Sequence, residues 1–121
     1  MSGLTQPWPI ELRLNSSKDL LAISFDRGER YELAAEYLRA ESPSAVVQGH
    51  GPLERRFVPG KRHVKISALE PVGHYAVRIV FDDGHDSGLY TWSYLLELGR
   101  EREDKWAAYL EGLASHGLKR D

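Results

Sequence analysis

Apolar residues alternate with polar ones over residues 10–14, 21–25 and 31–33. A period of two is typical of strands with one buried and one exposed face. The segments between them are short and rich in turn-forming residues, which favours antiparallel pairing of neighbours. The pattern predicts a three-stranded meander whose inward residues are Ile10, Leu12, Leu14, Leu21, Ile23, Phe25, Tyr31 and Leu33.

The period changes at Ala34. Residues 34–40 are mostly strong helix formers. Pro43 ends this predicted helix, because a residue before proline disfavours the helical conformation. Residues 42–61 then carry three prolines and three glycines with little periodicity. An irregular segment of that length is usually functional or disordered.

Strands resume in the second half of the chain. Residues 63–67 alternate again, and residues 74–82 hold the clearest strand pattern. A polar turn over residues 82–88 follows, and then the apolar pair at 89–90. One face of the clearest strand is predicted to consist of Tyr75, Val77, Ile79 and Phe81.

Two helices are predicted next. Thr91 can cap a helix over residues 92–98, which Gly99 would end in the left-handed conformation. A last helix is expected over residues 100–116, and residues 117–121 resemble a frayed helix end. Its apolar stripe follows the spacing i, i+3, i+4, i+7 and comprises Trp106, Tyr109, Leu110 and Leu113.

The order of elements is typical of an α+β domain. We expect antiparallel sheets, a short mid-chain helix and C-terminal helices that pack on the sheet. No repeat or linker divides the chain, and 121 residues is an ordinary length for one domain. Residues 1–121 are therefore predicted to form a single domain that can bury a core without metal or disulfide.

Charge and cysteine content narrow the function classes. The 16 basic and 18 acidic residues give a net charge of −2, so no basic excess attracts nucleic acid or anionic lipid. Cysteine is absent, which excludes thiolate zinc sites, cysteine-ligated iron–sulfur clusters and thiol nucleophiles in this chain. Apolar runs of about four residues are too short for a membrane span, and no secretory leader pattern is seen. We expect a cytoplasmic protein.

The densest polar segment is the predicted turn around His85. His85 is a candidate metal ligand, and Asp83 or Asp86 could be a second ligand or orient its ring. The two carboxylates are expected to favour the protonated form of His85. The alternative is a plain turn in which Asp and Gly serve backbone geometry. These three donors cannot complete a tetrahedral site by themselves.

A second candidate lies in the irregular segment, where His50 stands between two glycines. Such glycines allow a ligand or partner to approach the backbone closely, and the alternative is a flexible exposed loop. Tyr90 and Trp92 are either core anchors or an exposed aromatic patch for a partner. We predict a partner surface formed by Gly49, His50, Gly51, Gly84, His85, Asp86, Tyr90 and Trp92.

Three stretches together resemble a known family. They are residues 35–51, residues 70–77 with the sequence EPVGHYAV, and residues 81–99, which begin FDDGHDSGLYTW. The resemblance is to small bacterial proteins grouped with the N-terminal domain of gamma-butyrobetaine hydroxylase. It extends over roughly residues 8–112.

The resemblance carries expectations about metal and activity. In gamma-butyrobetaine hydroxylase the similar domain precedes an oxygenase domain and binds a structural zinc through three cysteines and one histidine. His85 matches that histidine, and the cysteines would fall around Ser42 and Ser44. Because this chain has neither the cysteines nor the oxygenase domain, we transfer neither the zinc nor the activity.

The resemblance also indicates an accessory role, since a similar domain is attached to Mrp-type ATPases that deliver iron–sulfur clusters. We expect a non-catalytic accessory domain that binds a protein partner, linked to iron–sulfur or redox metabolism. The sequence offers no nucleophile–base pair and no cofactor fingerprint, so no cofactor is expected. The alternatives are a metal-binding domain that uses His85 with His50 or Asp86, and an uncharacterised enzyme.

Overall fold

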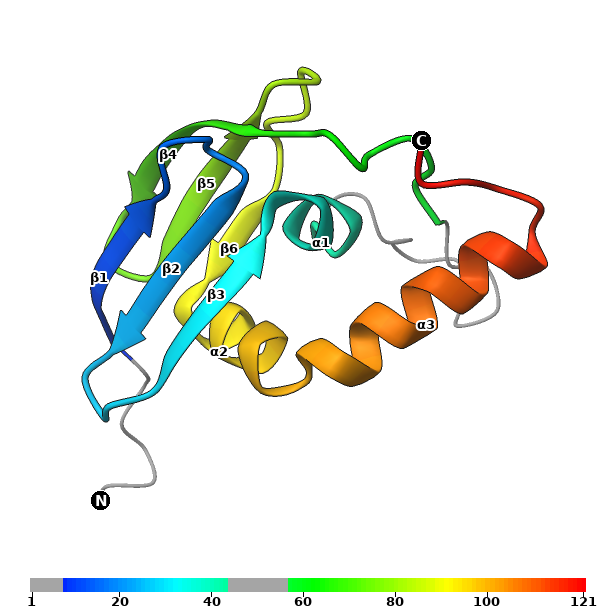
Figure 1. Cartoon of the computed structure of the whole chain (residues 1–121). Coiled ribbons are helices and arrows are strands. Elements are labelled where there is room, and N and C mark those ends of the chain that lie inside the picture. The colour runs from blue at the N-terminus through cyan, green and yellow to red at the C-terminus, as the bar shows by residue number, and fades with distance from the viewer. Residues whose placement is uncertain (1–7, 44–56) are drawn as a thin grey trace.

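The computed structural model describes residues 8–43 and 57–121. Strands β1-β2-β3 form an antiparallel sheet, sheet A, and strands β4-β5-β6 form a second one, sheet B (Figure 1). This architecture confirms the predicted α+β class. The elements are β1 (Pro9–Leu14), β2 (Leu20–Phe25), β3 (Arg30–Ala34), α1 (Ala35–Ala40), β4 (Ile66–Val72), β5 (Ala76–Phe81), β6 (Leu89–Thr91), α2 (Trp92–Arg100) and α3 (Arg102–Ser115).

Sheet A follows the predicted meander. β2 pairs with β1 on one side and with β3 on the other, and its inward residues are at most 1% exposed. The prediction for Ile10 is wrong, because its side chain is 68% exposed. The pairing shifts between Pro9 and Glu11. An irregularity of this kind breaks the alternation and turns Ile10 away from the core.

Sheet B differs from its prediction in β4, which begins at Ile66 instead of residue 63, and in the turn between β4 and β5. β4 continues through Pro71, which is tolerated because β4 is an edge strand. Gly73 has a φ of 56° in the turn. Tyr75 lies in this turn and is 54% exposed, so its predicted inward position is wrong. The other predicted inward residues are confirmed as buried, namely Val77, Ile79 and Phe81.

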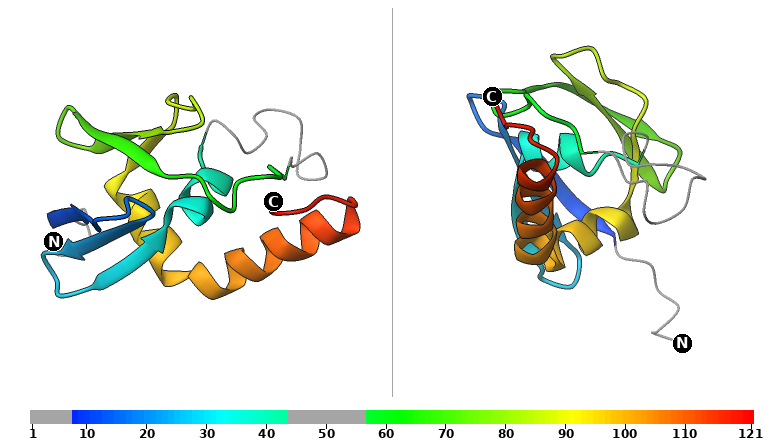
Figure 2. Two further views of the ribbon diagram at one scale, coloured as in Figure 1. Left: turned by 45° about the horizontal axis from the view of Figure 1, so that its top comes forward. Right: turned by 90° about the vertical axis from the view of Figure 1, so that its right-hand side faces the viewer.

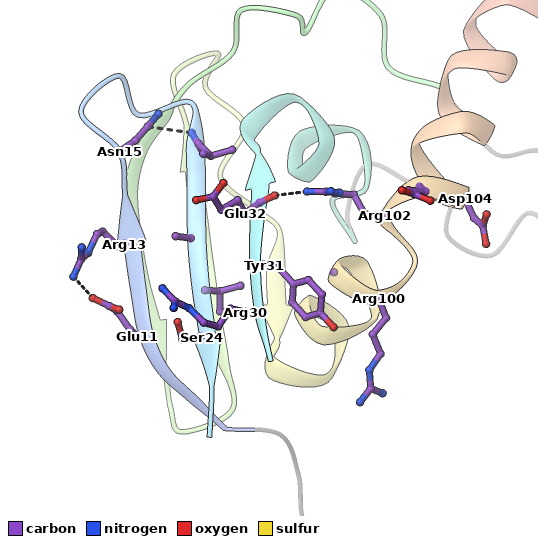
Figure 3. A pocket seen from close by; sticks show the side chains of 15 residues that line it. Glu11, Arg13, Asn15, Ser24, Arg30, Tyr31, Glu32, Arg100, Arg102 and Asp104 are labelled. Carbon is purple, nitrogen blue, oxygen red and sulfur yellow. Dashed lines mark hydrogen bonds and ion pairs between the residues drawn. The ribbon is translucent and has the colours of Figure 1, made fainter. Parts of the chain in front are cut away.

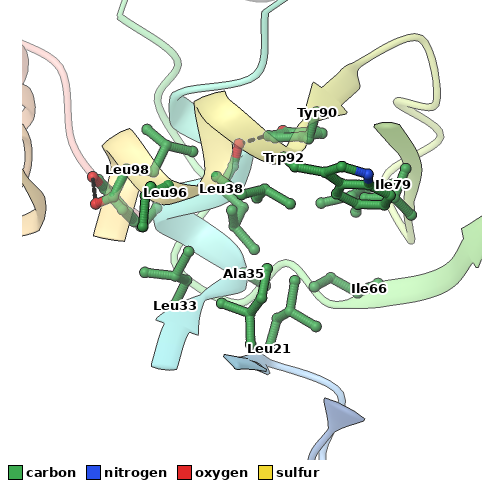
Figure 4. Close-up of a cluster of buried hydrophobic side chains, with 14 of the residues drawn as sticks. Leu21, Leu33, Ala35, Leu38, Ile66, Ile79, Tyr90, Trp92, Leu96 and Leu98 are labelled. Carbon is green, nitrogen blue, oxygen red and sulfur yellow. Dashed lines mark hydrogen bonds between the residues drawn. The ribbon is translucent and has the colours of Figure 1, made fainter. Parts of the chain in front are cut away.

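The inner faces of the two sheets and the helices α1 and α2 enclose the main core (Figures 2 and 4). Two buried tyrosine hydroxyls connect these layers. Tyr37 of α1 donates to the carbonyl of Leu98 in α2 at 2.7 Å. Tyr90 of β6 donates to the carbonyl of Leu38 in α1 at 2.5 Å. Burial of each phenol is therefore compensated by a hydrogen bond, and α1 is fixed to both neighbours.

Helix α2 begins as predicted and ends differently. The Thr91 hydroxyl accepts a hydrogen bond from the Tyr94 amide at 3.1 Å, which confirms the N-cap. Gly99 lies inside the helix instead of ending it. A Cβ at Gly99 would stand 2.4 Å from the ring of Tyr31. Glycine is thus required here because α2 packs closely on β3.

Helix α3 extends away from the sheets (Figure 2). Tyr109 and Leu113 form a second apolar cluster with Ala40 of α1, and Trp106 meets Tyr37 edge-on at 6.3 Å between ring centroids. The predicted apolar stripe is therefore the docking face, and it packs on α1 and on Phe57. Within the described ranges, no helix is long and apolar enough to cross a membrane.

The end of the chain folds back as a strap instead of fraying. The carbonyls of Lys119 and Arg120 accept hydrogen bonds from the amides of Gly60 and Arg62 at 2.9 and 3.0 Å. The Arg120 guanidinium also forms a bidentate ion pair with Glu36 of α1, at 2.7 and 2.9 Å. Since the Glu36 side chain is only 6% exposed, this pair anchors the strap to α1.

Candidate functional site

A carboxylate in the turn between β5 and β6 joins three parts of the chain. Asp83 Oδ2 accepts from Arg39 Nε of α1 at 2.9 Å and from Lys61 Nζ at 2.6 Å. Asp83 Oδ1 accepts from the backbone amide of His85 at 3.0 Å. We call Arg39, Ser42, Lys61, Asp83 and His85 the polar corner.

These contacts keep Asp83 ionised. Burial alone would raise the pKa of this carboxyl. The hydrogen bonds from Lys61, from the His85 amide and from Arg39 outweigh that effect and lower the pKa to about 2. The corner is therefore held by charge-assisted hydrogen bonds at neutral pH.

The His85 ring is partly buried, and its Nε2 is hydrogen-bonded to Ser42 Oγ at 2.9 Å. Burial and the neighbouring Arg39 cation lower the pKa of His85 below its usual value, although the nearby carboxylates oppose them. The two carboxylates do favour the protonated ring, as expected, but burial of the ring and the Arg39 and Lys61 cations outweigh them, so the net shift of the pKa favours the neutral ring.

Asp86 faces a different neighbour. Its carboxylate lies 3.5 Å from the guanidinium of Arg78 on β5, and its carbonyl accepts a hydrogen bond from the same side chain at 3.1 Å. Gly84 has a φ of 93°, which a turn of this shape requires. The structure thus brings His85 to Ser42 and pairs Asp86 with sheet B.

The two aromatic candidates are core residues. Tyr90 is 0% and Trp92 9% exposed, and the Trp92 indole donates to the carbonyl of His74 at 2.9 Å. The expectation of an exposed aromatic patch at these positions is therefore wrong, since both rings are buried in the main core. The remaining members of the predicted surface lie outside the described residues, namely Gly49, His50 and Gly51.

The polar corner gives the fold a pH dependence. Asp83 has a pKa of about 2 in the folded chain, below its value of about 4 when unfolded. The stabilisation is complete above pH 4 and is lost as pH falls from about 4 to about 2. We expect stability measured by urea titration to fall more steeply over that interval in the parent than in Asp83→Asn. Equal slopes for the two proteins would show that ionisation of Asp83 does not cause this loss of stability.

Sheet A carries a different feature on its outer face, a wide hollow of about 890 Å³ (Figure 3). Small residues of the central strand β2 form its floor, and charged residues of β1 and β3 flank them. The strand register sets two rows across the sheet, Glu11–Ser24–Arg30 and Arg13–Ala22–Glu32. Each row places opposite charges on either side of a small residue.

A smaller cavity of about 370 Å³ adjoins this hollow. Its apolar lining consists of Leu20, Ala34, Tyr37 and Trp106. Arg102 at the start of α3 donates to the carbonyl of Glu32 at 2.9 Å. The two hollows share the lining residues Leu20, Glu32, Arg102 and Glu103. They form one continuous surface, which we call the groove.

Sequence reasoning missed the groove. Its apolar part forms where the first turn of α3 meets the ends of β2 and β3, and no local periodicity fixes how a helix packs on distant strands. One signal was present in the sequence. Ala22 and Ser24 are small residues at outward positions of β2, where an exposed sheet face more often carries long polar side chains.

Comparison with known proteins shows which family this fold belongs to. The family model for the gamma-butyrobetaine hydroxylase-like N-terminal domain matches residues 12–96. The chain belongs to this family. Two solution NMR structures are similar to it, each with 44% identity and a TM-score of 0.82 over 97% of this chain, and over 92% and 87% of theirs.

A crystal structure from Acidithiobacillus ferrooxidans is also similar. It represents a protein of unknown function in the DUF971 family, with 35% identity and a TM-score of 0.66 over 78% of this chain and 98% of that one. No curated protein matches the chain.

The donors at the polar corner do not fit the structural zinc that the family resemblance implies. His85 does lie against Ser42, around which the resemblance expects a cysteine. Structural zinc sites use four ligands drawn mainly from cysteine and histidine, and a serine hydroxyl does not replace a thiolate. In the part of the chain that the structure describes, no group of three or more His, Cys, Asp or Glu side chains is placed so that it could hold a metal ion.

Proposed function

We propose that this chain is a non-catalytic protein-interaction domain, accessory to a separate enzyme or iron–sulfur carrier, and that the groove is its docking surface. One observation carries the proposal. The charged hollow over sheet A and the apolar cavity at Trp106 are continuous through shared lining residues. An apolar pocket beside a polar, solvent-accessible rim is the usual anatomy of a protein interface.

The shape of the groove favours a polypeptide partner. Small-molecule sites are concave and mostly apolar, with few polar groups, whereas this hollow is broad and carries charges on three sides. The charged residues come from β1, from β3 and from the corner between α2 and α3. A partner segment that crosses sheet A would meet both signs of charge along its length.

The apolar cavity indicates which side chain the partner segment inserts. Its volume of about 370 Å³ holds one large apolar side chain of a partner. Glu32, Arg102 and Glu103 lie on the boundary with the charged hollow, so the net charge of this boundary is negative. The fitting partner is therefore an extended segment with one apolar anchor and a neighbouring basic residue.

The test compares two substitutions of the same kind. Ala34 lines the cavity and is exposed, and Ala108 is an exposed residue of α3 outside the groove. We expect tagged parent protein and Ala108→Glu to capture the same partner from the native host, and Ala34→Glu to lose it. Equal capture by both variants would overturn the groove as the docking surface.

The same samples address the alternative function. Metal content is measured on the captured parent protein. A partner retained without stoichiometric metal supports the interaction domain. Stoichiometric metal without a reproducible partner would favour a metal-binding domain instead.

A further inference from the structure

Two segments that are distant in sequence, α1 and the residues before β4, meet at the turn between β5 and β6. Asp83 accepts from Arg39 and Lys61, as described above. The adjacent Asp82 adds two bonds to the strand-entry segment. Its Oδ1 accepts from the Lys65 amide at 2.9 Å, and its own amide donates to the Lys65 carbonyl at 2.8 Å. Two successive aspartates therefore hold α1, the segment before β4 and the β5–β6 turn together.

If the polar corner had the structural zinc that the family resemblance implies, the ion would be bound at His85. Two cations, Arg39 and Lys61, already neutralise the carboxylate nearest to His85. A divalent ion at His85 would be repelled by both of them. The Ser42 hydroxyl is fully buried and bonded to His85. It offers an alcohol oxygen where a thiolate is needed.

Close packing reinforces this arrangement. A Cβ at Gly88 would stand 2.4 Å from Ser42 Oγ and 3.1 Å from the Tyr90 ring. Gly88 thus lets the β5–β6 connection approach the residue that follows α1, so the hydroxyl fits the space between the turn and the helix. Packing, hydrogen bonds and ion pairs all act on the same junction.

We propose that the Asp83 ion pairs with Arg39 and Lys61 replace zinc as the structural link at this corner, and that the corner neither requires nor accepts the metal. The inference is independent of the proposed docking function. It also makes the junction insensitive to thiol oxidation, because no thiolate takes part.

The experiment compares thermal melts of the parent, Asp83→Asn and Asp86→Asn. Asp86 is the matched control, since it is an exposed aspartate of the same turn that pairs with Arg78. We expect Asp83→Asn to lower the melting temperature by roughly 5–8 °C and Asp86→Asn by about 2 °C or less. A strong chelator, or one equivalent of zinc chloride, should leave the parent melt unchanged.

These measurements distinguish a corner held by ion pairs from a corner held by zinc. A fall of several degrees on chelation, or a similar rise with added zinc, would overturn the proposal. So would equal melting of Asp83→Asn and Asp86→Asn. If Asp83→Asn does not fold, Lys61→Gln removes one ion pair and should lower the melting temperature by roughly half as much. The chelator and zinc measurements need only the parent protein.

Discussion

Truncation of Trp106 to alanine is expected to lower the free energy of unfolding by about 2–4 kcal/mol. The indole packs edge-on against Tyr37 of α1 and lies 5.4 Å from the ring of Tyr109. The Arg120 guanidinium stands 5.2 Å from its centroid on the C-terminal strap. The substitution removes contacts to two elements at once, while partial exposure keeps its effect below that of a fully buried tryptophan.

Trp8 provides the matched control. It is 48% exposed and lies just before β1, so Trp8→Ala is expected to change the free energy of unfolding by about 0.5 kcal/mol or less. Urea denaturation of both variants measures the difference. If the two substitutions have equal effects, α3 is not docked through Trp106.

The second large effect is expected at the ion pair between Arg120 and Glu36. Arg120→Ala leaves the Glu36 carboxylate, which is only 6% exposed, without its bidentate partner. We expect the free energy of unfolding to fall by about 2–3 kcal/mol. Lys119→Ala alters a neighbouring exposed residue of the same strap and should leave stability near that of the parent.

A double-mutant cycle distinguishes the pair from general loosening of the strap. Glu36→Gln in the Arg120→Ala background removes the buried charge, so it should cost less than Glu36→Gln in the parent. Additive losses would mean that the two side chains are not coupled. In that case the backbone bonds of Lys119 and Arg120 to residues 60–62 would hold the strap alone.

The sequence predicted features that depend on local periodicity. The alternation in residues 21–25 placed β2 correctly because one face of it is buried, and Thr91 identified the start of α2 because capping is a local hydrogen bond. The prediction that Gly99 ends α2 is wrong. The actual role of Gly99 is contact with Tyr31, a residue 68 positions earlier in the chain.

The candidate site was predicted only in part. His85 and Ser42 were related through the family resemblance, and the structure places their side chains in contact. The ion pair of Asp83 with Arg39 spans 44 positions, so no spacing rule could reveal it. The groove likewise depends on how α3 packs beside β3. A sequence pattern describes the faces of elements but does not say which distant faces meet.

The groove is proposed to bind the partner, and the polar corner is proposed to stabilise the fold. One paired measurement tests both roles, namely stability and partner capture for Ala34→Glu and His85→Ala. We predict that Ala34→Glu loses capture and stays within about 0.5 kcal/mol of the parent. His85→Ala should lose about 1–2 kcal/mol and retain capture. Loss of capture in a fully stable His85→Ala protein, with capture intact in Ala34→Glu, would contradict both proposed roles.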